Sequence, residues 1–344
     1  MTIVALLIIL FAVLILPFTV KKVEEDLELF LFIMGVLAVS VTSQWSLTLI
    51  EEALVEPIKI TAAVLIAGLL FRELKGFIQK YLNLTVKTTG LRLFSFLLVF
   101  FLGLISSAIT AIIAALVLVE AITHLKLDKK HETKLVILSC FSIGLGAALT
   151  PIGEPLSTIA IAKLKGAPYF AGFWFLAAHL WIYVLSSLFI LGGIAAYISG
   201  TRLSKNPGLS AQSRETFKDI LLRTGKIYLF VMALVFLGTG FKPLIDNYIT
   251  AISPEILYWI NILSAVLDNA TLAAAEIAPS MSLYQIKSAL LGLLIAGGML
   301  IPGNIPNIIA ANKLGIKSKE WAMFGIPVGL SLMIFFFLVL ILIK

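Results

Sequence analysis

Two short polar interruptions of otherwise apolar sequence hold the residues best suited to bind an ion. The first is Thr150-Pro-Ile-Gly-Glu-Pro155, and the second, weaker one is Ile301-Pro-Gly-Asn-Ile-Pro-Asn307. Because proline removes a backbone donor and disrupts helical geometry, both segments are predicted breaks in helices. Irregular backbone survives at membrane depth only where it is buried in protein or lines a cavity. The two breaks therefore predict a polar site in the middle of a membrane.

A polar segment precedes each break and supplies further oxygen atoms. These segments are Ser106-Ser-Ala-Ile-Thr110 and Leu267-Asp-Asn-Ala-Thr271. A hard cation such as Na⁺ takes oxygen ligands, and broken helices add backbone carbonyls to the side chains. We expect one site in each half of the chain. The candidate ligands are Ser106, Ser107, Thr110, Thr150, Gly153 and Glu154 in the first site, and Asp268, Asn269, Thr271, Gly303, Asn304 and Asn307 in the second.

Glu154 and Asp268 are the acidic residues expected at these mid-membrane positions, each holding Na⁺ at its own site. A charged side chain at a helix centre costs about 2.5–3.5 kcal/mol on insertion scales, and such residues usually mark ion or proton paths. Because a proton and Na⁺ compete for the same carboxylate, one group can couple opposite flows. The structural alternative is a carboxylate that caps a half-helix N-terminus, where the helix dipole favours negative charge. The two roles are compatible.

Three further residues are candidates for a proton path. Glu120, near the end of the first polar hairpin, is first a helix-end charge and second a proton-access residue. His179 lies in a long apolar helix, where it relays protons or forms a packing hydrogen bond. Glu276 follows Asp268 by two helical turns and faces the outer surface or lines an access path. The sequence leaves these alternatives open.

The composition is that of a polytopic integral membrane protein. Of the 344 residues, 60% are hydrophobic and 13% are charged, whereas soluble domains have roughly 45–50% and 25%. Several apolar runs reach the ~20 residues that span a bilayer. The net charge of +7 is attributed to cytoplasmic loops, which are rich in Lys and Arg, and not to nucleic-acid binding. The sequence has no nucleotide-binding phosphate loop and no metalloprotease motif, so no ATP-driven pump, enzyme or organic cofactor is expected.

The predicted fold is all-α, with two inverted-topology repeats. Each repeat has a re-entrant helical hairpin followed by a discontinuous transmembrane helix. Basic residues flank 91–124 on both sides, so this segment is expected to enter and leave from the cytoplasmic side. The N-terminus is then outside a cell inner (plasma) membrane. The predicted parts are scaffold helices (1–53), repeat 1 (54–199, with hairpin 91–124 and broken helix 134–165), a cytoplasmic linker (200–222), and repeat 2 (223–344, with hairpin 254–280 and broken helix 286–314).

Individual helices are expected at 2–20, 27–49, 54–71, 169–199, 223–240 and 321–343, with an interfacial amphipathic stretch before residue 90. The repeats align through Gly153-Glu-Pro155 with Gly303-Asn-Ile-Pro306, and serines 106 and 107 are expected to take the places of Asp268 and Asn269. Inverted repeats with broken helices are a recurrent plan of secondary transporters, whose sites lie near the bilayer midplane.

These motifs resemble those of a known transporter group. Thr150-Pro-Ile-Gly-Glu154 is similar to the TPIGD motif of NhaD-type sodium/proton antiporters, and Leu263-Ser-Ala-Val-Leu-Asp-Asn269 is similar to their SALxDN segment. Both motifs belong to the ion transporter (IT) superfamily, which also contains arsenite permeases and divalent anion/sodium symporters. The resemblance covers roughly residues 90–315. The chain also resembles a short prokaryotic group, DUF1646. It departs from the pattern in Glu154, where relatives have aspartate, and in Ser106-Ser107, where they often have Asp-Asn.

The resemblance implies a homodimer in the lipid bilayer and an elevator-like movement of the hairpins and broken helices. It also implies a sodium site in each repeat. The function expected from the residues and the resemblance together is Na⁺(Li⁺)/H⁺ antiport. The alternative is a sodium-coupled small-anion (dicarboxylate) symporter or an arsenite-type efflux carrier. In that case the carboxylates would bind coupling ions while an anion sits between the hairpin tips.

Overall fold

The computed structural model describes residues 2–124, 128–199, 217–248 and 252–343. Its described residues are mainly helical and include no strand, in agreement with the predicted all-α class. The helices of the first half are α1 (Thr2–Thr19), α2 (Lys21–Glu25), α3 (Leu27–Thr42), α4 (Leu47–Ile109), α5 (Ala111–His124), α6 (Lys129–Ala147), α7 (Pro155–Lys163) and α8 (Phe175–Ile198). Those of the second are α9 (Phe217–Tyr248), α10 (Pro254–Ile260), α11 (Asn269–Glu276), α12 (Leu283–Gly297), α13 (Ile305–Leu314) and α14 (Ser318–Ile343), with 3₁₀ turns at Asn261–Ala265 and Ile301–Gly303.

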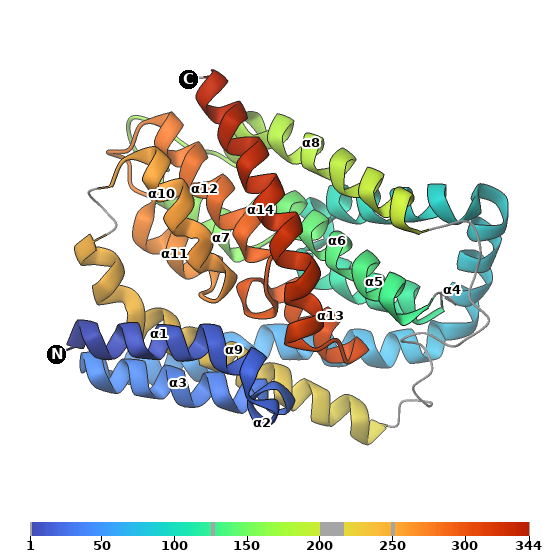
Figure 1. The fold of residues 1–344 in the computed structure, drawn as a ribbon, viewed down its shortest axis with the longest axis horizontal. Helices are drawn as coiled ribbons and strands as arrows, with labels where there is room; N and C mark the ends of the chain where they lie inside the picture. The colour runs from blue at the N-terminus through green and yellow to red at the C-terminus, as the bar shows by residue number, and fades with distance from the viewer. Residues whose placement is uncertain (1, 125–127, 200–216, 249–251, 344) are drawn as a thin grey trace.

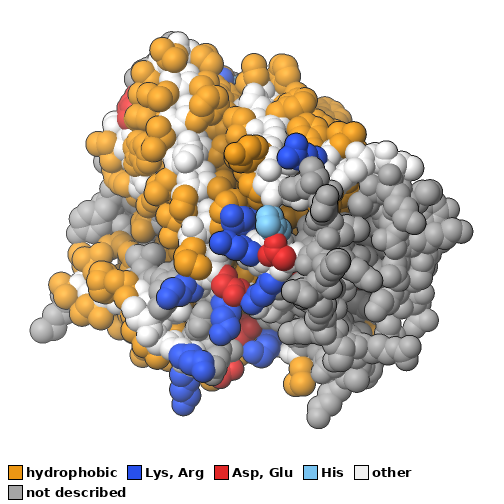
Figure 2. All heavy atoms as spheres, turned by 45° about the vertical axis from the view of Figure 1, so that its right-hand side comes forward, with side chains coloured by type: hydrophobic (Ala, Val, Ile, Leu, Met, Phe, Trp, Pro, Cys, Tyr) orange, Lys and Arg blue, Asp and Glu red, His pale blue; other side chains and the backbone are white. Residues whose placement is uncertain are grey.

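Four helical segments are long and apolar enough to cross a membrane: Thr88–Ile109, Phe175–Ile198, Thr224–Leu244 and Ser318–Ile343. Their apolar side chains are only partly buried within the chain. On the face drawn in Figure 2, the described side chains are mainly hydrophobic, and the charged ones gather in its lower part. A surface of this kind requires an apolar surrounding. The chain is therefore a membrane protein whose partner is the lipid bilayer.

The helices form two groups (Figure 1). α1, α3, α9 and the first part of α4 lie together at one side. The shorter helices α5–α7 and α10–α13 form the other group with α8 and α14 across it. α4 joins the groups, because after Gly90 (φ 75°) its last part returns to pack against α5, α6 and α8.

The predicted boundaries near the N-terminus were wrong. The expected helix 27–49 ends at Thr42, since Ser43 adopts a left-handed conformation (φ 55°). The expected short helix 54–71 instead starts at Leu47, where the Ser46 hydroxyl accepts a hydrogen bond from the Leu49 amide at 3.0 Å. It continues as α4 through the stretch predicted to be interfacial. The predicted 200–222 linker falls mostly on residues outside the described ranges, and α9 begins at Phe217.

Helix breaks occur at both places where proline and glycine predict them. α6 stops at Ala147 and α7 begins at Pro155; α12 stops at Gly297 and α13 begins at Ile305. Proline occupies the first turn of α7 and of α13, where a missing backbone donor is not needed. The hairpin segments are also interrupted, at Thr110 between α4 and α5 and before α11.

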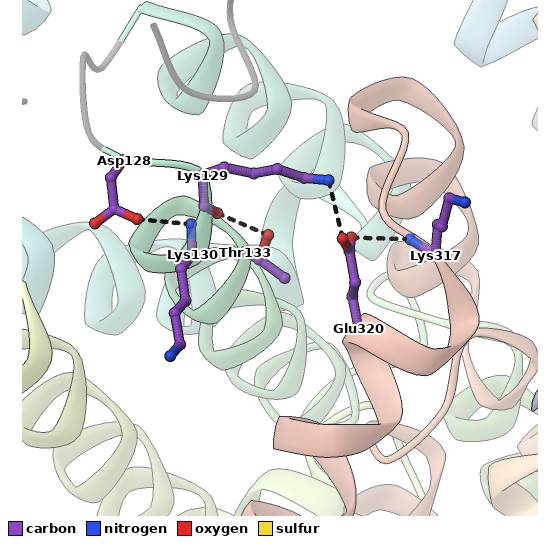
Figure 3. A network of polar contacts seen from close by, with 6 residues as sticks. All are labelled: Asp128, Lys129, Lys130, Thr133, Lys317 and Glu320. Carbon is purple, nitrogen blue, oxygen red and sulfur yellow. Dashed lines mark hydrogen bonds and ion pairs between the residues drawn. The ribbon is translucent and has the colours of Figure 1, made fainter. Parts of the chain in front are cut away.

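The start of α6, which carries Lys129 and Lys130, and the start of α14 are tied together and form a charged end of the bundle. Lys129 Nζ lies 2.9 Å from Glu320 Oε1, and Glu320 also accepts from the Lys317 amide at 3.4 Å (Figure 3). Asp128 caps α6 by accepting a hydrogen bond from the Lys130 amide at 2.8 Å. These contacts hold α6 and α14 together at one end of the bundle.

The Asp128 cap makes stability depend on pH. Its burial acts to raise the pKa of Asp128, but hydrogen bonds from His131 and Lys130 outweigh it and hold the pKa below the usual 3.8. A lowered carboxyl pKa stabilises the fold above the usual value, and this stabilisation is lost as pH falls through the folded-state pKa. We expect Asp128→Ala to cost about 1 kcal/mol at neutral pH. The control Asp128→Asn keeps a capping oxygen, so its difference from wild type should shrink below about pH 4 in thermal unfolding. A difference that grows there would contradict the assignment.

Candidate functional site

A cavity of about 370 Å³ lies where the two halves of the chain meet. Four helices begin at its wall: α5 after Thr110, α7 after Glu154, α11 after Asp268, and α13 after Asn304. The complete lining is Thr110, Ala111, Ile112, Pro151, Ile152, Gly153, Glu154, Pro155, Thr158, Ile159, Asp268, Asn269, Asn304 and Ile305. The predicted two sites therefore open into one shared cavity.

The two predicted carboxylates belong to the same side of this cavity. α7 packs against α11, which brings Glu154 at the start of α7 within electrostatic range of Asp268. Glu154 is only 5% exposed, and its Oε1 has no hydrogen-bond partner among the described residues. Asp268 is half-buried. The sequence predicts one acid in each of two separate sites. In the structure the two acids, which come from different halves of the chain, instead lie close enough to repel each other.

Asn269 completes this side of the cavity. It is 4% exposed and lies beside the Glu154 carboxylate. Its Nδ2 is buried without a hydrogen-bond partner among the described residues. Buried polar atoms are normally hydrogen-bonded, so the Asn269 amide and the Glu154 carboxylate are placed to bond each other or a ligand in the cavity.

The opposite side holds neutral groups. α5 packs against α13, which places Thr110 and Asn304 on this side. The Thr110 hydroxyl accepts a hydrogen bond from the Ile113 amide at 3.3 Å. Asn304 precedes α13 without capping it by its side chain. Instead its amide lies over Gly144, where an added Cβ would be 2.4 Å from Asn304 Nδ2.

The cavity combines negative side chains with positive helix ends. None of the described residues that line it is Lys, Arg or His. Each helix N-terminus carries a partial charge of about +0.5, so four of them roughly balance two carboxylates. Among the described residues no group of three His, Cys, Asp or Glu side chains is placed to hold a metal ion. The donor set is therefore two carboxylates with amide, hydroxyl and carbonyl oxygens, which suits a hard monovalent cation better than a transition metal.

Five predicted ligands lie outside the lining and hold the breaks in place. The Ser107 carbonyl accepts a hydrogen bond from the Thr150 hydroxyl, which ties the first tip to the first break. Asn307 Nδ2 donates to the carbonyls of Gly297 and Leu300, both at 2.8 Å, and so bridges the second break. The residues outside the lining are Ser106, Ser107, Thr150, Gly303 and Asn307. Thr271 lies in α11, but its side chain falls outside the described residues.

Gly153 and Gly303 are needed because each break folds back on the helix before it. An added Cβ would lie 2.0 Å from the Ala147 carbonyl oxygen at Gly153, and 2.6 Å from the Gly297 carbonyl oxygen at Gly303. No side chain fits at these distances. In both breaks the glycine meets the carbonyl oxygen six residues before it.

The serine hydrogen bonds favour a different alignment of the hairpin tips from the predicted one. Ser106 donates to the Ile143 carbonyl at 2.9 Å, and Ser264 donates to the Leu293 carbonyl at 3.0 Å. Each accepting residue stands ten positions before its break glycine. Ser106 therefore matches Ser264, and Thr110 matches Asp268. Ser264 was missed as a positioning residue, although it precedes Asp268 by the same spacing as Ser106 precedes Thr110.

The proton-path candidates do not line the cavity. Glu120 is half-buried in α5. His179 Nδ1 lies 2.7 Å from the Phe175 carbonyl oxygen one turn back in α8, as in the packing interpretation. Glu276 is buried, and Asn261 Nδ2 donates to its Oε2 at 2.9 Å.

A comparison with curated proteins gave no match. A family model does match residues 3–343, almost the whole chain. The chain therefore belongs to the family described as protein of unknown function (DUF1646).

Proposed function

We propose that the chain is a secondary active transporter that exchanges Na⁺ or Li⁺ for protons. The observation that carries this proposal is the pair of buried Glu154 and half-buried Asp268, which face one cavity without a basic side chain in its described lining. Like charges at close range disfavour the doubly ionised state. Either a cation or a proton relieves this repulsion, and binding of one disfavours binding of the other. Such competition is the minimum requirement for antiport.

The site residues have distinct proposed roles. The carboxylates of Glu154 and Asp268 bind the cation in exchange for protons. Oxygen atoms of Asn269, Asn304 and Thr110 complete its shell, because they line the same cavity. The four helix N-termini offset part of the negative charge of the carboxylates, so that a bound cation can leave the site again.

Alternating access is proposed to arise from two inverted repeats with re-entrant hairpins. Two features support this arrangement. If α5 corresponds to α11 and α13 to α7, the contact between α5 and α13 has its counterpart in the contact between α11 and α7. The hydrogen bond of Ser106 likewise has its counterpart in that of Ser264. A site at the interface of such repeats opens to either side when one group of helices moves. We extend this to an elevator-type homodimer of the ion transporter superfamily.

The proposed orientation in the plasma membrane puts the N-terminus outside. The basic side chains Lys129 and Lys130 at the start of α6 support it. Cytoplasmic loops carry an excess of Lys and Arg. The N-terminus and the starts of α6 and α14 lie at opposite ends of the bundle (Figure 1).

A second candidate is symport of a small anion with sodium. The convergence of four helix N-termini favours it, because such ends attract anions. The buried Asn269 Nδ2, which lacks a hydrogen-bond partner among the described residues, could donate to a carboxylate. Against it stand the two acids of the lining.

Proteoliposomes distinguish the two candidates. For the antiporter, a Na⁺ gradient alone should drive proton movement reported by an internal pH dye, and Li⁺ should substitute for Na⁺. For the symporter, a Na⁺ gradient should instead drive uptake of radiolabelled small dicarboxylates without opposite proton movement. Wild-type protein that moves neither protons nor dicarboxylates under a Na⁺ gradient would sink both proposals.

A further inference from the structure

Another buried carboxyl group lies at the far end of α11 from the cavity. Glu276 is 5% exposed and does not line the cavity. Asn261, at the end of α10, is 1% exposed and donates from Nδ2 to Glu276 Oε2 at 2.9 Å. The two side chains form an isolated acid–amide pair inside the second half of the chain.

The hydrogen-bond inventory of this pair lacks one donor. Asn261 Nδ2 uses both of its hydrogens, one to Glu276 and the other to the Ala289 carbonyl at 3.0 Å. This fixes the orientation of the amide, because a flip would set its oxygen against that carbonyl. Asn261 Oδ1 and Glu276 Oε1 are both buried without a partner among the described residues. A proton on Oε1 supplies an O–H donor, and a carboxylic acid can then bond a primary amide through both of its oxygens.

Among the described residues, no charged group forms an ion pair that would offset an ionised Glu276. The elements packed against α11 are α7, α9, α12 and the Asn261–Ala265 turn. The described charged side chains on these elements are Lys163 in α7, Lys226 and Lys242 in α9, and Lys287 in α12. None of them forms an ion pair with Glu276. Among the described residues, the side chain that hydrogen-bonds to Glu276 is Asn261. A buried carboxylate without a counter-charge is strongly disfavoured, whereas its protonated form needs only hydrogen bonds.

The fold itself does not require an acid here. With Ser106 matched to Ser264, Asn261 matches Gly103 and Glu276 matches Leu118. Leu118 is fully buried in the core. The helix crossings also correspond, since Gly103 meets α6 at Ser142 and Asn261 meets α12 at Gly292. The first half thus makes the same crossing with a glycine and a leucine, so the polar pair serves something other than packing.

The pair lies between the cavity and the surface. Glu276 lies seven positions after Asn269, which is about 10 Å along a helix. Pro279 and Ser280, just beyond α11, are exposed. We infer that Glu276, held by Asn261, is a second proton-binding site that takes up a proton at Oε1 from this surface and releases it during the transport cycle. The role in transport rests on the proposed function, whereas the presence of the proton does not.

Infrared spectroscopy of purified protein tests the proton directly. At neutral pH the wild-type minus Glu276→Gln spectrum should contain a protonated-carboxyl band that disappears as pH is raised. The matched control, Glu255→Gln in α10, changes a half-buried carboxyl group outside the pair, so the band should persist in this variant. Glu276→Gln should fold, because the glutamine amide supplies the missing donor. Absence of the band from the difference spectrum would overturn the inference.

Transport assays test the release of that proton. Glu276→Gln in proteoliposomes should lose Na⁺-driven proton movement while keeping ²²Na⁺/Na⁺ exchange, since the cavity is intact. Asn261→Asp, which lets two carboxyl groups share a proton, should keep coupled movement with a shifted pH midpoint. Unchanged proton movement and pH profile in Glu276→Gln would show a purely structural group and overturn the transport role. Lack of Na⁺-driven proton movement in the wild type would overturn the proposed function instead, and the infrared band still decides the protonation of Glu276.

Discussion

Glu154→Gln and Asp268→Asn are each expected to reduce Na⁺-driven proton movement to the level of protein-free liposomes. Each substitution removes one of the two carboxylates that face the cavity. The remaining carboxylate can still bind a proton or a cation. Without the charge of the second carboxylate, however, binding of the cation no longer drives release of the proton. Internal pH, followed after a Na⁺ pulse, measures the loss.

Stability separates this loss from misfolding. Because Glu154 and Asp268 repel each other, neutralising either should leave the thermal midpoint unchanged or raise it. Glu154→Asp preserves the charge on a shorter side chain, so this control should retain coupled movement with a weaker apparent affinity for Na⁺. Glu320→Gln, which changes an acid paired with Lys129 at the charged end, should transport as wild type. Full coupled movement in Glu154→Gln or Asp268→Asn would sink the assignment of these carboxylates.

The helix breaks could be predicted because their causes are local. Proline at 151, 155, 302 and 306 cannot donate to a helical hydrogen bond. Gly153 and Gly303 stand where the chain folds back on a carbonyl oxygen. The class of protein was also predictable, since apolar composition alone requires a membrane. These features depend on residues near one another in the chain.

The role of the serines could not be predicted in the same way. Ser106 and Ser107 suggested an interrupted helix, but α4 continues to Ile109. A serine hydroxyl in a helix can bond a carbonyl of the preceding turn, as Ser107 does with Leu104 at 2.9 Å and Ser106 with Gly103 at 2.6 Å. Ser106 also reaches the Ile143 carbonyl on α6. A pair of serines in an apolar segment can therefore either interrupt a helix or lie within one and bond a neighbouring helix. The sequence alone does not distinguish the two, because the difference depends on the helix that packs against the serines.

The pairing of Glu154 with Asp268 depends on contacts between distant segments. Each acid lies beside its own hairpin or break in the sequence, which suggested separate sites. The observed pairing arises because α7 of the first half packs against α11 of the second. Packing between helices of different halves leaves no pattern in the local sequence. An internal repeat nevertheless makes such packing one of the few arrangements to consider.

Gly146→Ala is expected to destabilise the protein by on the order of 3 kcal/mol, since it overfills a tight crossing. α6 crosses α4 there with so little space that a Cβ on Gly146 would lie 1.7 Å from the Gly103 carbonyl oxygen. Small residues permit such close approach of membrane helices. Separating the helices would also break the hydrogen bonds of Ser106 to Ile143 and of Ser142 to Val99, at 2.9 and 2.7 Å.

The same crossing positions the cavity, so its loss should reach the site. α4 ends at Ile109, directly before Thr110, and α6 ends at the first break; the Ala111 amide donates to the Gly153 carbonyl at 2.9 Å. The matched control is Gly193→Ala in α8, where an added Cβ meets no atom within 4 Å; it should raise stability slightly, because alanine favours helix over glycine. Thermal unfolding of detergent-solubilised protein compares the two. Equal midpoints for Gly146→Ala and Gly193→Ala would contradict a close crossing of α4 and α6, and with it the geometry that brings Thr110 to the cavity.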